Sequence, residues 1–250
     1  MIYYVFPIIS AYFFSSSLNY IKDNIKERYP LKNVYLGLLS IPFFIFFPLH
    51  FTLYDVYFSL FCFLSEFFLL LNLRKISQSM TFFFISLKSL VLVVFDLYNH
   101  SLENLAILFP VLVSIMIFNR KHISIFLIFS FFFDALSLIL CQKMKGDSLS
   151  IQANKNILLA CISIPFLKRI YVHHQYFYSF LSSTIYFYPL KFVVLSLYSL
   201  TDFTLPYIGL FQDVVVSKMK FDKKIVFNIL LSTVFFCILI FVVFLKFTKK

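Results

Sequence analysis

Long apolar runs separated by short polar clusters form the pattern along this chain of 250 residues. The runs lack the alternation that marks barrel strands, and open sheet edges do not occur in hydrocarbon, so the pattern favours helices. A helix crosses a bilayer with about 20 residues, and most of the runs approach that length. The pattern predicts ten spans, at 2–18, 34–51, 56–73, 80–95, 102–118, 123–141, 157–172, 177–195, 203–216 and 225–245.

The seventh run leaves two alternatives open, because only 157–167 is continuously apolar before Lys168 and Arg169. Either the span ends there and both cations lie at the membrane surface, or the cations lie within the membrane and face a cavity. In the second case the cavity would favour an anionic solute.

The composition agrees with a membrane protein. Hydrophobic side chains make up 61% of the chain and charged ones only 13%, with a mean hydropathy of +0.91, whereas a soluble domain is about half apolar and about a quarter charged. We expect a single integral, multi-pass membrane domain in the plasma or inner membrane, with the lipid bilayer as its partner. The net charge of +11 does not indicate nucleic acid, since Lys and Arg gather in the connectors, where they set orientation.

The distribution of cations over the two sides predicts the orientation of the chain. Fourteen fall on one side: Lys22, Lys26, Arg28, Lys32, Arg74, Lys75, Arg120, Lys121, Lys168, Arg169, Lys218, Lys220, Lys223 and Lys224. Six fall on the other: Lys143, Lys145, Lys155, Lys246, Lys249 and Lys250. The positive-inside rule then places both termini outside the cytoplasm.

A short internal repeat divides the chain into halves. Ser-Ile-Pro-Phe at 40–43 returns at 163–166, an offset of 123 positions. A weaker correspondence at an offset of 124 pairs Lys88 with Gln212. Each half holds five predicted spans, and because five is odd, a second copy enters from the opposite side of the membrane. We predict two inverted five-helix repeats, an arrangement that recurs in transporters. They cover residues 1–121 and 122–250.

One local pattern in each half carries a resemblance to a known family. The third span runs through Leu-Arg-Lys-Ile-Ser-Gln-Ser-Met at 73–80 into the fourth, and a polar elbow at 96–103 follows. In the second half, Leu-Tyr-Ser-Leu-Thr-Asp-Phe at 197–203 precedes an elbow at 218–224. With five plus five helices, the whole chain resembles the EamA-like drug/metabolite transporter superfamily. The resemblance implies a secondary transporter whose fourth and ninth spans line a central cavity, with both termini in the cytoplasm, opposite to the cation count.

Ionisable side chains inside the predicted spans are the candidate binding residues, because a charge in hydrocarbon is costly. Glu66, Lys88, Asp134 and Lys191 lie in the third, fourth, sixth and eighth spans. The resemblance adds Gln212 as the ninth-span counterpart of Lys88. We predict that these five residues contact the substrate. The alternative is a structural role in ion pairs between helices, such as Glu66 with Lys191 or Asp134 with Lys88.

The sequence offers little for catalysis or for a cofactor. It has three glycines and no nucleotide-binding motif, which argues against ATP-driven transport by this chain alone. His173 and His174 are adjacent but have no further ligands at helical spacing, so we expect no metal. The four cysteines show no paired spacing, and we expect them to behave as small apolar residues.

We therefore predict a secondary transporter, not an enzyme, that moves a small organic metabolite by alternating access. One alternative is a non-catalytic membrane subunit or assembly factor of a larger complex, whose charges pair with partners. Another is an intramembrane enzyme that acts on lipids, with Asp134 or a histidine as acid and base.

Overall fold

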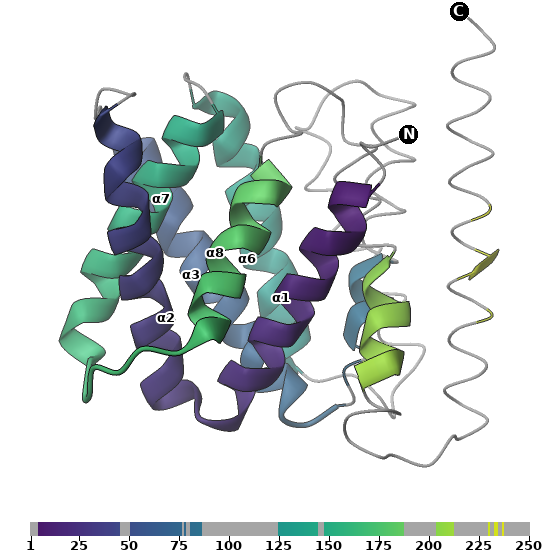
Figure 1. Cartoon of the computed structure of the whole chain (residues 1–250). Coiled ribbons are helices and arrows are strands. Elements are labelled where there is room, and N and C mark those ends of the chain that lie inside the picture. The colour runs from purple at the N-terminus through teal and green to yellow at the C-terminus, as the bar shows by residue number, and fades with distance from the viewer. Residues whose placement is uncertain are drawn as a thin grey trace, which may run out of the picture.

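The computed structural model describes residues 5–45, 51–76, 78, 81–86, 125–144, 148–187, 204–212, 230, 233, 234 and 237. Every regular element in these stretches is a helix, which confirms the all-α class. The elements are α1 (Val5–Asp23), α2 (Ile25–Ser40), the 3-10 helix η2 (Ile41–Ile45), α3 (Leu53–Leu73), α6 (Ile125–Lys143), α7 (Ser148–Ser163), the 3-10 helix η4 (Ile164–Phe166) and α8 (His174–Phe187) (Figure 1). Residues 81–86 and 204–212 are helical as well.

Among the described residues, α3 is the helix that is long and apolar enough to cross a membrane. Its 21 residues extend about 31 Å at 1.5 Å per residue, close to the hydrocarbon thickness of a bilayer. A shorter apolar stretch, Ile125–Ser137, lies in α6. α3 begins at Leu53, before the predicted start at 56, because a capping box precedes it. The Asp55 N–H donates to Thr52 Oγ1 at 3.3 Å, and the Thr52 N–H donates to the Asp55 carboxylate at 2.8 Å.

α2 and α7 each begin nine residues before the spans predicted at 34–51 and 157–172. Hydropathy places the start of a span where polar residues stop, but the polar first halves of both helices are folded and hold buried polar side chains. Each helix ends at a serine that Ile-Pro follows. Proline has no N–H to donate to the carbonyl four positions earlier, and each helix continues as a 3-10 turn.

Antiparallel helix pairs build the described part of the bundle: α1 with α8, α3 with α6, and α2 with α7 (Figure 1). The direction is clear from bonds between α1 and α8, where Ser10 contacts Ser182 and Ser16 contacts Gln175. α2 also contacts α8, and α7 also contacts α3. The two halves of the chain are therefore intertwined, because each pair takes one helix from each half.

Stacked phenylalanines hold α3 against α6. The Phe68 ring lies with its centroid 5.2 Å from that of Phe129 and 5.8 Å from that of Phe133. Such offset aromatic pairs add stabilisation beyond the apolar area that they bury.

The interior of the bundle is rich in polar groups, and much of its outer surface is apolar. The described residues bury 20 polar or charged side chains and expose 21 large hydrophobic ones. Tyr12 on α1, Leu38 on α2 and Tyr57 on α3 are each about half exposed, whereas Ser15, Asn33 and Ser59 on the same helices are wholly buried. Each of these helices thus turns polar side chains inward and apolar ones outward.

Candidate functional site

α2 and α7 pack closely against each other at Gly37. A Cβ atom added to Gly37 would lie 2.5 Å from Cβ of Ala160 and 3.2 Å from the backbone oxygen of Asn156. A side chain at this position would force the helices apart, so a small residue sets the distance between them. Gly37 and Ala160 are 123 positions apart in the sequence, so the crossing joins corresponding points of the repeated segment.

Two matching hydrogen bonds lie near this crossing. Asn33 Nδ2 donates to Ser163 Oγ at 2.9 Å, and Asn156 Nδ2 donates to Ser40 Oγ at 2.8 Å. All four side chains are buried. The two asparagines are 123 positions apart, and so are the two serines. The same bond therefore forms twice, in opposite directions, between two similar helices.

The repeat in the sequence is longer than the four residues Ser-Ile-Pro-Phe from which it was predicted. At the same offset, Lys-Asn at 32–33 returns at 155–156. Seven of the 13 positions from 31 to 43 are identical to those from 154 to 166. Extending the comparison toward the N-terminus of the repeat would have identified the bonded asparagines.

The helix pairs α1–α8 and α3–α6 each contain a contact between two serines. Ser10 Oγ donates to the Ser182 carbonyl at 3.1 Å, and Ser182 Oγ donates to the Ser10 carbonyl at 3.0 Å. Between α6 and α3, Ser130 Oγ donates to the Ser65 carbonyl at 2.8 Å, and the two hydroxyl oxygens are 3.5 Å apart. Ser65 and Ser182 each end a Phe-Leu-Ser sequence, so the pairs α1–α8 and α6–α3 use matching residues.

Gln212, one of the predicted binding residues, lies in a group of polar side chains that we call the amide cluster: Ser15, Gln78 and Gln212, which are buried, and Asn19, which is partly buried. The side-chain oxygen of Gln212 accepts from Ser15 Oγ at 2.7 Å, from Gln78 Nε2 at 2.9 Å and from Asn19 Nδ2. Ser15 and Asn19 belong to α1, Gln78 directly precedes the helical stretch 81–86, and Gln212 ends 204–212. The cluster brings three separate parts of the chain together without a charged member.

Glu66 is ion-paired, with a partner that the sequence pattern had assigned to a connector. Lys32 Nζ in the middle of α2 contacts Glu66 Oε1 on α3. The Lys32 side chain is 1% exposed and that of Glu66 is 22% exposed. The ammonium also lies 4.8 Å from the centroid of the Tyr29 ring. The prediction that Lys32 is a connector cation is wrong, because α2 starts at Ile25 and carries it into the bundle.

The remaining predicted contacts are only partly placed. Asp134 lies on α6 and is half-buried, and its backbone oxygen accepts a bond from Ser137 Oγ at 2.7 Å. Lys88 and Lys191 lie outside the described residues. The pairs of Asp134 with Lys88 and of Glu66 with Lys191 therefore stay predictions.

Lys168 and Arg169 lie outside the helices of the bundle. They follow η4 in the irregular segment 167–173, and both side chains are exposed. The prediction that the seventh span extends to 172 is wrong, because Ile-Pro ends α7 at Ser163. The exposure of both side chains gives no support to the alternative in which they face a cavity, and an anionic solute stays a prediction of that alternative.

His173 lies immediately before α8 and stacks on Tyr20 of α1, with ring centroids 4.0 Å apart. The Arg28 guanidinium lies 4.1 Å from the centroid of the same tyrosine ring. Burial in this contact lowers the pKa of His173, and the nearby His174 and Arg28 lower it further, which favours the neutral imidazole. Within the described stretches, no three His, Cys, Asp or Glu side chains gather as metal ligands.

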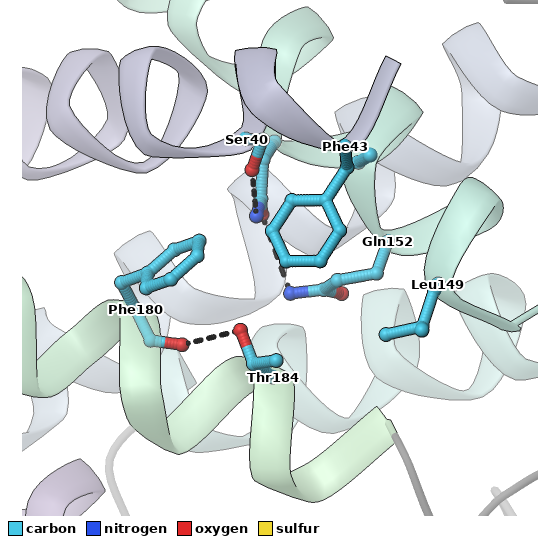
Figure 2. A pocket seen from close by; sticks show the side chains of 8 residues that line it. Ser40, Phe43, Leu149, Gln152, Phe180 and Thr184 are labelled. Carbon is cyan, nitrogen blue, oxygen red and sulfur yellow. Dashed lines mark hydrogen bonds between the residues drawn. The ribbon is translucent and has the colours of Figure 1, made fainter. Parts of the chain in front are cut away.

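A small pocket lies between α2 with η2, α7 and α8. Figure 2 shows the side chains of Phe43, Leu149 and Phe180 around the amide of Gln152. The pocket has room for about one water molecule. Gln152 Nε2 donates to Asn156 Oδ1 at 3.4 Å, whereas Gln152 Oε1 has no bonding partner in the described part. The pocket suits a water bound to that oxygen and is too small for an organic solute.

Comparison of the chain with protein-family models, with curated proteins and with solved structures found no match.

Proposed function

We propose that the protein is a multi-pass membrane carrier that moves a small organic solute by alternating access. The observation that carries the proposal is the crossing of α2 and α7, where the bond between Asn33 and Ser163 repeats as the bond between Asn156 and Ser40. Two copies of one segment that meet in opposite directions are what an inverted repeat produces. Transporters with inverted repeats place their substrate site at the interface between the copies.

The distribution of polarity supports a membrane environment. A bundle in water that exposes so many large apolar side chains would lose the hydrophobic stabilisation that folding supplies. In lipid the same outer surface is favourable, and the buried polar groups satisfy one another between helices. We infer that the chain crosses the membrane ten times, with α1, α2, α3, α6, α7 and α8 among the spans.

We further propose that residues 1–121 and 122–250 are the two inverted copies, as in the drug/metabolite transporters that the sequence resembles. The exchange of helices between halves supports this, because α1 pairs with α8 as α6 pairs with α3. A rocking motion of the halves would shear these antiparallel pairs, and the serine contacts across them are bonds that can be broken and remade.

The candidate polar contacts of the carrier are the five predicted residues together with Lys32. Gln212 belongs to the amide cluster. In the proposed carrier, the Lys32–Glu66 ion pair breaks and re-forms as a gate opens and closes. Lys88, Asp134 and Lys191 complete the proposed set. Intramembrane ionisable groups of this kind are functional candidates because their burial is costly.

Uptake by proteoliposomes tests the function. The purified full-length chain is reconstituted and offered a mixture of amino acids, amides, sugars, organic acids and amines, and the vesicle content is measured by mass spectrometry. We expect one chemical class to accumulate above the level in protein-free liposomes. We also expect Lys88→Ala to abolish that uptake without lowering expression.

A chain that reconstitutes as a monodisperse protein but accumulates none of these classes would contradict the carrier. That result would favour the non-catalytic membrane subunit, which needs only the helical scaffold.

A further inference from the structure

The amide cluster has a mismatch between its donors and its acceptors. Gln212 Oε1 receives three donors, from Ser15, Asn19 and Gln78, although a carbonyl oxygen has two lone pairs. In contrast, Gln78 Oε1 is buried and has no hydrogen-bond partner in the part of the chain that the structure describes. Buried polar atoms are normally paired. Gln212 Oε1 therefore has one donor too many, and Gln78 Oε1 lacks a donor.

The orientation of the Gln78 amide follows from its surroundings. Its Nε2 lies 3.3 Å from the backbone oxygen of Ser15, 2.6 Å from Ser15 Oγ and 2.9 Å from Gln212 Oε1. A backbone carbonyl oxygen can only accept, so the group that faces it is the NH₂ group. The unpartnered atom is therefore the oxygen of Gln78.

We infer that the amide cluster is a binding subsite for an uncharged primary carboxamide, or for a group with the same neighbouring acceptor and donor, and that Gln212 occupies it in the state described here. This inference rests on the proposed carrier function. The carbonyl oxygen of the solute replaces Gln212 Oε1 as the acceptor for two of the three donors, those of Ser15 and Gln78. Its adjacent NH₂ group donates to Gln78 Oε1, so the two amides join through a pair of reciprocal hydrogen bonds.

The same geometry discriminates against a carboxylate. A carboxylate has no hydrogen to donate, so it would leave Gln78 Oε1 unpaired and place a second acceptor against it. The four residues of the amide cluster are all uncharged, and burial of an anion without a cation is costly. Rejection of an analogue that leaves buried polar groups unpaired is a strong source of specificity.

Binding to the full-length chain in detergent tests the subsite independently of transport. Thermal unfolding is followed by the loss of the monodisperse peak, in the presence of propanamide or of sodium propionate at the same pH and ionic strength. We expect propanamide to raise the unfolding temperature in a saturable manner and propionate to leave it unchanged. A ligand that binds the folded state alone stabilises it in this way.

Two substitutions shift the apparent affinity for propanamide in opposite directions. Ser15→Ala removes one donor and should weaken binding about three- to ten-fold. Gln212→Met keeps the side-chain length but removes the competing oxygen, so binding should become tighter by a similar factor. Ser17→Ala is the matched control, because Ser17 is a buried serine on the same helix whose hydroxyl has no partner in the described stretches. It should leave the affinity unchanged.

A purely structural role for the cluster would change the unfolding temperature of the variants without opposite changes in affinity. The inference is overturned if propionate stabilises as well as propanamide does, if neither stabilises, or if Gln212→Met fails to tighten binding. Proteoliposomes that accumulate another class of solute, with no effect of propanamide, would overturn the subsite and leave the carrier. Stabilisation by propanamide without uptake of any solute would overturn the carrier and leave the subsite.

Discussion

The buried ion pair between Lys32 and Glu66 is the strongest constraint at the scale of single residues. The Lys32 side chain is 1% exposed, so its ammonium depends on Glu66 and on the Tyr29 ring rather than on water. Glu66 is 22% exposed and retains some access to other partners. Removal of one member of such a pair costs more than the pair contributes, because the other charge stays buried.

We predict an asymmetric double-mutant cycle for this pair. Glu66→Gln strands the buried ammonium and should lower the free energy of unfolding by about 3 kcal/mol. Lys32→Met should cost less, since the better exposed carboxylate can be hydrated. The double variant should be more stable than Glu66→Gln alone. Thermal unfolding of the four proteins in detergent measures the cycle, and a double variant as unstable as the sum of the single ones would contradict the pairing.

At this scale, the sequence indicates candidate binding residues where an ionisable side chain interrupts an apolar run. Glu66 interrupts an apolar run, and the structure places it in an ion pair. Gln212 was predicted instead as the counterpart of Lys88 in the second half, and the structure places it in the amide cluster. Lys32, Asn33 and Asn156 lie in polar stretches, so the pattern assigned them to connectors. A polar residue that faces a neighbouring helix looks the same in the sequence as one that faces water.

At the scale of the helices, the approach of α2 to α7 depends on the size of two facing residues. A Cβ at Gly37 would lie 2.5 Å from that of Ala160, so the crossing accepts one methyl group and not two. The asparagine–serine hydrogen bonds between α2 and α7 require the two helices to keep this close approach. The Ser-Ile-Pro-Phe repeat includes Ser40 and Ser163, which both accept a bond from an asparagine, but it did not predict where the helices start. Their starts depend on packing and on caps such as Thr52, which hydropathy does not register.

A swap of the two residues at the crossing tests this packing. Gly37→Ala should lower the unfolding temperature, because the two methyl groups collide. Combining it with Ala160→Gly should recover most of the loss, since the pair then has its original volume. Leu38→Ala, on the exposed face of α2, is the control and should have little effect. A swap variant no more stable than Gly37→Ala would show that the helices do not meet at this point.

At the scale of the whole molecule, each antiparallel pair links a helix of the first half to a helix of the second. α1 and α3 of the first half pair with α8 and α6 of the second, and α2 and α7 meet between them. The sequence predicted the two halves from the repeat and from the number of apolar runs. It could not predict which helices pair, because apolar runs rich in phenylalanine are nearly interchangeable as partners. Each of the three pairs has a serine or asparagine contact that occupies a single position.

The sidedness of the connectors that precede α3 and α8 tests the inverted arrangement most directly. Phe51→Cys and Lys168→Cys, both at exposed positions, are introduced singly into a chain whose four native cysteines are replaced by alanine. Intact cells are treated with a membrane-impermeant maleimide before and after permeabilisation. The account predicts that one of the two cysteines reacts in intact cells and that the other reacts only after permeabilisation. Reaction of both from the same side of the membrane would contradict it.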